Sequence, residues 1–378
     1  RVYPFTWSES WGTKPIVISP TGERLVYLAD QETPGDLGLY SARLDGPANP
    51  LRLAHGFAPY YHFEAQIEAS GERVVYVATP NGQTDRVLFS ARLDGSAPAL
   101  RLSAAGYHIV SLFALSPDGA YVTYLSQDSE TQTQLWRAPT DGSAPAVVVS
   151  QPFASGPGVR IFALSPDATR VVYAAGDGTD LRLYSRASDG SGSALQLNDG
   201  PLKLEYIRIS PDGARALYRE TLGANIDGFF TVPLDRSSNP LRLNATSACT
   251  RVTSYAFAPD SARAVFAGDE GRDCLYSALL DGSAPAVRLH ARLPAFTRLV
   301  FSGRISADSK RVVYVADAQV DERFELYSTA IDGSEEPRRL DPAGQPASDI
   351  VAVAGGERVV FASDPTFDGA YELFVAQL

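Results

Sequence analysis

Short stretches of alternating apolar and polar residues recur along the whole chain, separated by turn-forming residues. Two examples are LYSARLDG at 39–46 and RVVYVA at 73–78. Alternation with a period of two predicts strands that bury one face. The three-to-four-residue spacing of an amphipathic helix is absent, so we predict an all-β protein.

A tight-turn motif precedes an aromatic strand in eight copies. They read ISPTGERLVY, IEASGERVVY, LSPDGAYVTY, LSPDATRVVY, ISPDGARALY, FAPDSARAVF, ISADSKRVVY and VAGGERVVF. In the SPDG form Pro fixes φ, Asp caps its own backbone and Gly adopts the left-handed conformation. The Asp after a second aromatic strand has the same period, with spacings of 49, 47, 48, 46, 46 and 51 residues between Asp45, Asp94, Asp141, Asp189, Asp235, Asp281 and Asp332. A period of about 40–50 residues made of short strands predicts one four-stranded β-propeller blade per copy.

Two aromatic positions recur in all eight copies. The first holds Tyr27, Tyr76, Tyr124, Tyr173, Tyr218, Phe266, Tyr314 and Phe361. The second holds Tyr40, Phe89, Trp136, Tyr184, Phe230, Tyr276, Tyr327 and Phe374. Large flat side chains fill the wedge between twisted sheets, so we interpret both columns as inter-blade core and not as catalytic tyrosines.

The two ends of the chain complement each other. The eighth copy stops at ELFVAQL, after its third strand, and RVYPFTW at 1–7 precedes the first copy as an unassigned strand. Pairing the two would complete the last blade and cover an exposed edge. We therefore predict a single domain, residues 1–378: an eight-bladed β-propeller of four-stranded antiparallel blades, closed by the N-terminal strand. Seven blades plus an appended element is the alternative that the eight matched copies disfavour.

The repeated SPDG, aromatic, LY and DG elements resemble the TolB-like β-propeller repeat, also called PD40 and related to WD40. The resemblance covers essentially the whole chain and implies the propeller fold. It implies no single function, because such propellers serve as periplasmic scaffolds, peptidase gating domains and ligand-binding modules. The sequence departs from the repeat at Glu68, Ala307 and Ala354, so we expect less regular hairpins there.

Composition narrows the classes of partner. The 378 residues carry a net charge of −11, and only three of the 33 basic residues are Lys. Nucleic-acid binding needs clustered Lys and Arg, so we expect no nucleic-acid partner. No apolar run approaches the ~18 residues of a transmembrane helix. The chain contains no Met, even at position 1, so we expect it to begin after a processing or cloning boundary, with any export signal out of view.

Motifs for catalysis are missing from the sequence. There is no Gly-x-Ser-x-Gly elbow, P-loop, H-E-x-x-H pair or dinucleotide-binding glycine pattern. Of the four histidines, His55, His62 and His108 come from neighbouring loops and could share a metal, but solvated surface histidines are the simpler interpretation. We predict no catalytic residue, no metal site and a protein that is not an enzyme.

The loops that differ between copies fall on one face of the predicted ring, and they are rich in carboxylates. Such loops on a rigid scaffold often carry function, and their like charge favours a cationic or basic protein partner. The candidate binding residues are Asp180, Asp227, Asp269, Glu270, Asp273, Asp321, Asp364 and Asp368. Carboxylates also suit Ca²⁺, but no set matches a calcium loop, so we predict no cofactor and retain Ca²⁺ as a hypothesis. A solvated rim that keeps the protein soluble is the alternative.

The predicted central channel offers a second candidate site. Gln66, Arg208 and Arg304, together with Glu64, interrupt apolar first strands. A buried charge needs a partner, so we expect these residues to face a water-filled channel. They could orient an anionic ligand, or the arginines could pair with nearby carboxylates.

Cys249 and Cys274 both belong to the variable face of the sixth copy. We predict a disulfide between them, which implies an oxidising, extracytoplasmic compartment; two free thiols in a cytoplasmic protein are the alternative. The asparagine of the Asn-Ala-Thr sequon, Asn244, lies on the same face.

These patterns favour a non-enzymatic, extracytoplasmic recognition or scaffold module that is monomeric. It would bind a protein or other ligand through the acidic face or the channel mouth. A propeller lyase or hydrolase with its site at the channel mouth is one alternative. A structural subunit of a surface layer or filament is the other, and it predicts self-association.

Overall fold

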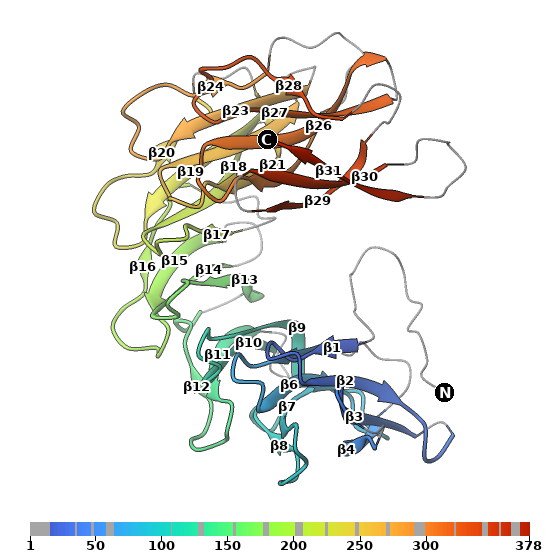
Figure 1. Cartoon of the computed structure of the whole chain (residues 1–378). Coiled ribbons are helices and arrows are strands. Elements are labelled where there is room, and N and C mark those ends of the chain that lie inside the picture. The colour runs from blue at the N-terminus through green and yellow to red at the C-terminus, as the bar shows by residue number, and fades with distance from the viewer. Residues whose placement is uncertain are drawn as a thin grey trace. The chain divides into compact units, whose positions relative to one another are not determined.

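The computed structural model describes most of the chain. The described residues are 16–34, 36–46, 49–57, 64–106, 108–127, 132–153, 156–176, 181–200, 207–223, 226–245, 249–269, 273–290, 299–320, 323–341, 347–354, 357–363 and 371–378. Within them every regular element is a β-strand and none is a helix (Figure 1). The chain forms two compact units, Arg1–Leu195 and Gln196–Leu378. The all-β prediction is confirmed.

The first unit consists of antiparallel meanders. The first sheet contains β1 (Ile16–Ile18), β2 (Arg24–Ala29), β3 (Leu37–Arg43) and β4 (Leu51–Phe57). The second contains β5 (Glu64–Ile67), β6 (Arg73–Ala78), β7 (Val87–Arg92) and β8 (Leu100–Arg101). Two further meanders are β9 (His108–Leu115), β10 (Tyr121–Gln127), β11 (Thr133–Pro139), β12 (Val147–Val148), then β13 (Gly158–Leu164), β14 (Arg170–Gly176), β15 (Leu181–Ala187), β16 (Leu195–Gln196). One parallel contact between Thr133 and Gly158 joins these two into an eight-stranded sheet.

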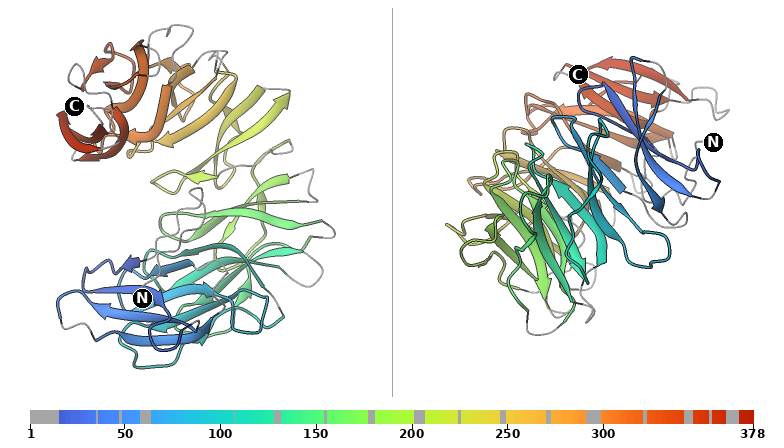
Figure 2. Two further views of the ribbon diagram at one scale, coloured as in Figure 1. Left: turned by 90° about the vertical axis from the view of Figure 1, so that its right-hand side faces the viewer. Right: turned by 90° about the horizontal axis from the view of Figure 1, so that it is seen from below.

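The second unit continues the same pattern. Its first two sheets contain β17 (Arg208–Ile209), β18 (Arg215–Gly223), β19 (Ile226–Pro233), β20 (Leu241–Arg242), and β21 (Arg251–Phe257), β22 (Arg263–Asp269), β23 (Asp273–Leu279), β24 (Val287–Arg288). The next contains β25 (Leu299–Ile305), β26 (Arg311–Val320), β27 (Arg323–Ala330) and β28 (Arg338–Arg339). The last has three described strands, β29 (Ala347–Ala354), β30 (Arg358–Ser363) and β31 (Glu372–Gln377). Figure 2 shows these strands from two further sides.

The turn between the first two strands of a sheet is fixed by its serine. Ser116 Oγ donates to Asp118 Oδ1 at 2.5 Å and accepts from Tyr121 N at 3.0 Å. Gly119 N donates to Ser116 O at 2.8 Å, which closes the turn. Because one hydroxyl serves both the Asp side chain and the next strand, a short hairpin is held without long-range help.

Two departures from the motif keep the same hairpin, contrary to our expectation. At Glu68 the roles are exchanged, because Ser70 Oγ donates to Glu68 Oε1 at 2.9 Å. At Ala307 the flanking Ser306 still donates to Asp308 Oδ1, at 2.6 Å. A donor and an acceptor two residues apart thus hold these turns in either order, while the turn from β21 to β22 closes with Ala258 at the serine position through backbone bonds. The third departure, at Ala354, borders residues outside the described part of the chain.

The two aromatic columns face each other across the second and third strands. All eight pairs are direct register partners, from Tyr27 opposite Tyr40 to Phe361 opposite Phe374. Seven of the pairs stack, with ring centroids 5.5–5.8 Å apart. Such offset stacking adds about 0.5–1.5 kcal/mol per pair beyond burial.

The core lies between consecutive sheets. Leu39 of the first sheet and Tyr76 of the second belong to one buried cluster. Phe229 and Phe266 join the sheets β17–β20 and β21–β24 in the same way. Within each unit, consecutive sheets thus pack face to face, as expected for propeller blades.

Candidate functional site

An arginine begins the second strand of most sheets, and its guanidinium bonds a hydroxyl of the third strand. Donor–acceptor distances are 2.9–3.3 Å in six pairs: Arg24–Ser41, Arg73–Ser90, Arg170–Ser185, Arg215–Thr231, Arg263–Ser277 and Arg311–Ser328. In the third sheet Tyr121 takes the arginine's place, and Arg137 of the third strand lies 3.7 Å above its ring. Sequence reasoning missed this column, although its position after each turn is visible in the repeat.

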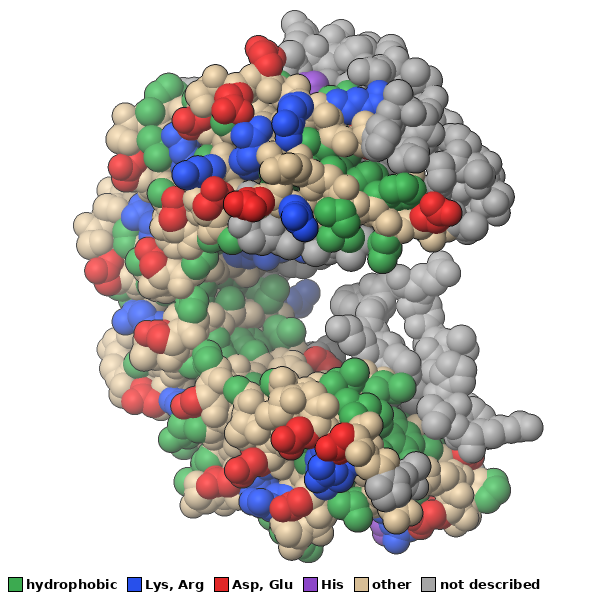
Figure 3. Space-filling view, viewed as in Figure 1, with side chains coloured by type: hydrophobic (Ala, Val, Ile, Leu, Met, Phe, Trp, Pro, Cys, Tyr) green, Lys and Arg blue, Asp and Glu red, His purple; other side chains and the backbone are tan. Residues whose placement is uncertain are grey.

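The aspartates of the DG turns are also committed to structure. Ser143 N donates to Asp141 Oδ1 at 2.9 Å, and Ser283 N to Asp281 Oδ1 at 2.9 Å. The bonds from Ser143 lower the pKa of Asp141, with Arg73 of the preceding sheet as a further cause. Acidic and basic side chains are interspersed on the face in Figure 3 and do not separate into patches. The repeated turns and the arginine column, which we call the turn face, thus use their charged side chains in bonds within the fold.

Most of the acidic candidates cannot be placed. Asp180, Glu270, Asp321, Asp364 and Asp368 lie outside the described residues. Two other acidic candidates, Asp269 and Asp273, can be placed by their backbones. They are register partners at the end where β22 and β23 meet in a hairpin. The structure thus brings these two positions together, and their role in binding stays a prediction.

Asp227, the remaining acidic candidate, is held between two sheets. Its carboxylate lies 3.8 Å from the Arg219 guanidinium and accepts from Val252 N at 3.2 Å. Arg219 also donates to Val252 O. These contacts give Asp227 a structural task between β19 and β21, besides the binding role that we predicted for it.

The channel candidates of the first unit form a small polar group on β5. Gln66 Nε2 donates to Phe113 O of the next sheet at 3.2 Å. Burial raises the pKa of Glu64, while the bond from Gln66 and the charge of Arg86 act against this. Burial also disfavours the charged form of Arg86, and this lowers the pKa of its guanidinium. Glu64 on β5 and Arg86, which directly precedes β7, thus share a partly desolvated environment.

The channel candidates of the second unit are exposed. Arg208 on β17 and Arg304 on β25 both reach solvent. The Arg208 guanidinium lies 5.8 Å from the Tyr255 ring of the next sheet, a weak cation–π contact. Among the described residues the ion pairs of this unit involve other arginines. Whether Arg208 and Arg304 orient an anionic ligand or pair with carboxylates stays a prediction.

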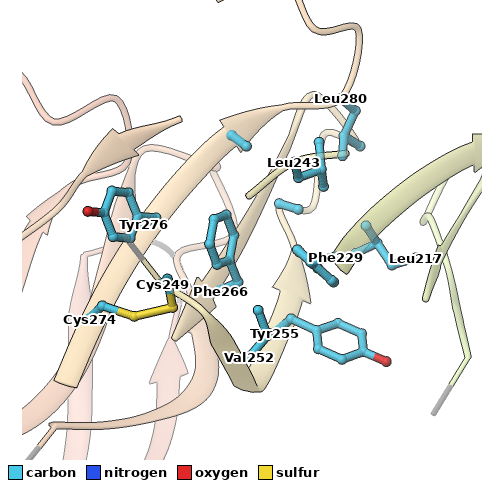
Figure 4. Close-up of a cluster of buried hydrophobic side chains, with 12 residues drawn as sticks. Leu217, Phe229, Leu243, Cys249, Val252, Tyr255, Phe266, Cys274, Tyr276 and Leu280 are labelled. Carbon is cyan, nitrogen blue, oxygen red and sulfur yellow. A yellow bond between two sulfur atoms is a disulfide. The ribbon is translucent and has the colours of Figure 1, made fainter. Parts of the chain in front are cut away.

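The predicted disulfide is present. Cys249 and Cys274 are bonded through their sulfurs at 2.11 Å, at a sequence separation of 25. Both side chains are buried in the cluster of Phe229, Phe266 and Tyr276 (Figure 4). The bond ties the segment that enters the sheet to its third strand.

The sequon asparagine has a structural role that sequence reasoning missed. Asn244 is 2% exposed, and its Oδ1 accepts from Phe229 N at 3.0 Å. Its Nδ2 donates to Asp227 O at 2.7 Å and to Cys249 O at 3.2 Å. Ser103 occupies the same place after another fourth strand and bonds Leu88 N at 3.3 Å. In the folded chain Asn244 is therefore inaccessible to a glycosyltransferase.

The histidines do not converge in the described part of the chain. His55 Nδ1 lies 3.8 Å from Asp36, His108 bonds Gln127 at 3.0 Å, and His290 packs edge-on against two tyrosine rings. His62 lies outside the described residues. Within those residues no group of three or more His, Cys, Asp or Glu side chains is placed to hold a metal ion, and no helix there is long and apolar enough to cross a membrane.

No family model matches the chain, and neither does any curated protein. Solved structures do match. A eukaryotic initiation factor aligns with 96% of this chain and 84% of its own, at 10% identity and a TM-score of 0.59. A putative TolB from Agrobacterium tumefaciens aligns with 87% of this chain and 94% of its own, at 15% identity and 0.39. The β-propeller domain of the Trilobed protease from Pyrococcus furiosus aligns with 85% and 94%, at 12% identity and 0.43.

The match to the initiation factor concerns the fold alone, because its identity is only 10%. It agrees with the succession of four-stranded antiparallel sheets described above. The chain has a fold of the β-propeller class.

Proposed function

We propose that the chain is a TolB-like propeller of eight blades, closed into one domain, that serves as a monomeric, non-enzymatic recognition or scaffold module outside the cytoplasm. The observation that carries this proposal is that the polar residues of the turn face bond within the fold, whereas the loops of the other face vary between copies. On the turn face the repeated charges are used for structure, which leaves the variable loops and the channel mouth for a partner. The disulfide supports the oxidising compartment.

Closure of the ring is supported by the exposure of the two end sheets. Leu373 on β31 is 69% exposed, whereas its seven counterparts are at most 1% exposed: Leu39, Leu88, Leu135, Leu183, Phe229, Leu275 and Leu326. At the other end Tyr27 is partly exposed, while the other seven members of its aromatic column are at most 1% exposed. In the interior sheets these two positions pack on each other, as Leu39 does on Tyr76. Leu373 and Tyr27 therefore present complementary faces.

The free edge of the last sheet supports the N-terminal strand as its closing element. A groove of about 370 Å³ runs beside β31, lined by Phe374, Val375 and Gln377 among others. Within the described residues β31 pairs only with β30. Residues 1–7, whose predicted partner is this edge, lie outside the described residues. An extended RVYPFTW segment would place Tyr3, Phe5 and Trp7 on one side, as an apolar edge requires.

Closure can be tested by comparing two leucine truncations. Leu326→Ala opens a cavity at a fully buried site, and about 2–5 kcal/mol of unfolding free energy is lost at such sites. Leu373→Ala should cost a similar amount if blade one covers it, and less than about 0.5 kcal/mol if the last sheet ends in solvent. Urea denaturation of both variants and the wild type measures the difference. A negligible effect of Leu373→Ala alone refutes closure.

Recognition can be tested by charge reversal on the variable face. The immobilised chain is incubated with the extracytoplasmic fraction of its source, and the retained proteins are quantified. Asp269→Lys combined with Asp273→Lys should reduce retention of the partner at least tenfold. Asp45→Lys combined with Asp94→Lys makes the same change of charge on the turn face and should leave retention unchanged. Equal retention by all three proteins refutes a partner site on the variable face.

A further inference from the structure

Three arginines on first strands of the Gln196–Leu378 unit differ from those of the turn face. Arg208 lies on β17, Arg251 on β21 and Arg304 on β25, and all three side chains are exposed. Within the described residues none has an ion pair, whereas Arg219, Arg236, Arg311 and Arg339 of the same unit each have one. In a chain of net charge −11, these three cations are available to an anion from outside.

The three charges are spread along the direction of the strands. Arg208 and Arg304 each stand two residues before the serine of a turn, and they pair with Leu217 and Val313 of the second strands. Arg251 lies at the other end of its strand, opposite Asp269. It precedes Ala256 by five residues, and Ala256 is the residue of β21 that lies at the level of Arg208 and Arg304. Five residues of strand span about 16 Å. A ligand that contacts all three must be extended and must carry several negative charges.

The edges of these strands favour a polypeptide over other polyanions. In the part of the chain that the structure describes, β17, β21 and β25 each pair with one strand only. Their second edges therefore offer backbone N–H and C=O groups beside the arginines. An extended peptide can satisfy such an edge with its own backbone, whereas a polyphosphate offers no N–H donors.

We propose that the first strands β17, β21 and β25 bind an extended acidic peptide, with its carboxylates paired to Arg208, Arg251 and Arg304. This inference rests on the proposed function, because only a closed ring turns these strands toward a channel. Asp269 is the register partner of Arg251, so the peptide has to compete with it at that position. The acidity of the rest of the chain does not prevent binding, since charges more than about 8 Å away are largely screened at physiological ionic strength. At contact distance the guanidinium groups dominate, and they can bind carboxylates through two parallel hydrogen bonds.

The test uses a fluorescein-labelled decaglutamate peptide and fluorescence anisotropy at 50 and 150 mM salt. The full chain should bind the peptide, more weakly at the higher salt. The variant Arg208→Gln with Arg251→Gln and Arg304→Gln should bind at least tenfold more weakly. The matched control, Arg43→Gln with Arg52→Gln and Arg92→Gln, removes three arginines from exposed ion pairs of the other unit and should bind as the wild type does.

Equal loss in both variants would show that only net charge matters, and would overturn the site. Absence of wild-type binding would overturn it as well. Polyphosphate of equal charge serves as the competitor, and displacement as effective as that by unlabelled decaglutamate would overturn the assignment to a peptide. Thermal melts verify that both variants are folded. If the peptide does not bind but Leu373→Ala lowers the free energy of unfolding as closure requires, only the peptide site is refuted. If Leu373→Ala leaves the free energy of unfolding unchanged, closure is refuted, and with it the channel.

Discussion

Breaking the Cys249–Cys274 bond tests both the cross-link and the number of folding units. The bond closes a loop of 25 residues, and the chain-entropy relation gives about 12 cal/mol/K for a loop of this size, or about 3.5 kcal/mol at 25 °C. The chain has no other cysteine, so a reductant acts on this bond alone. We expect reduction to lower the free energy of unfolding by about that amount.

The shift in melting temperature distinguishes one cooperative domain from two. With an unfolding entropy of about 2.1 cal/mol/K per residue, a loss of about 3.5 kcal/mol lowers Tm by about 4 °C if all 378 residues melt together. The shift is about 9 °C if the Gln196–Leu378 unit melts alone.

Differential scanning calorimetry with and without reductant measures the shift, and Cys249→Ser with Cys274→Ser serves as the permanently open reference. A mass increase of two hydrogens on reduction under denaturing conditions confirms that the bond was present. A stability change below about 1 kcal/mol after verified reduction would contradict the entropic reasoning.

Three further predictions concern single side chains, each measured by urea unfolding. Ala168→Gly should stabilise by about 0.5–1 kcal/mol because it relieves a left-handed alanine at φ 53°. Ser261→Gly, at φ 61°, should gain clearly less because its hydroxyl accepts an N–H from the neighbouring turn; equal gains would contradict a role for that bond. Burial raises the pKa of Glu68, so its contribution to stability is complete below the unfolded value and is lost as pH rises through the folded pKa. Glu68→Gln should therefore match the wild type at pH 4 and exceed it at pH 7, and a constant difference between the two pH values would refute this. Asn244→Ala should cost about 3 kcal/mol because it leaves three buried backbone groups unpaired, while Asn244→Ser keeps the bond from Phe229 and should cost less.

The sequence predicted the sheets well because their determinants are local and repeated. A serine and an aspartate two residues apart close a hairpin by themselves, and eight copies of an alternating strand define the period of the repeat. The aromatic columns were predictable for the same reason, since each pair is separated by one short hairpin. The Cys249–Cys274 bond was predictable because both positions fall on one face of a single copy.

Other contacts depend on neighbouring sheets and could not be read from one copy. Asp227 resembles any loop carboxylate in sequence, but the packing of one sheet on the next places it between Arg219 and Val252. Asn244 matches a sequon, yet the end of its short strand brings it to three backbone partners. The Asp227 contact leaves no periodic signal, whereas the polar cap after the short fourth strand recurs with different residues, as Ser103, Ser150, Asn244 and Asp341.

The same contrast between repeated and unrepeated residues indicates where a ligand belongs. An arginine that recurs at one position with the same hydroxyl partner, as Arg263 does with Ser277, is explained by the repeat and contributes to its stability. Arg208 and Arg304 occupy a first-strand position where the intervening sheet has Ala256, and the hairpin does not require a charge there. An exposed cation without a described carboxylate partner contributes little to stability, so its presence on β17 and again on β25 is better explained by an anion that it meets than by the sheet that holds it.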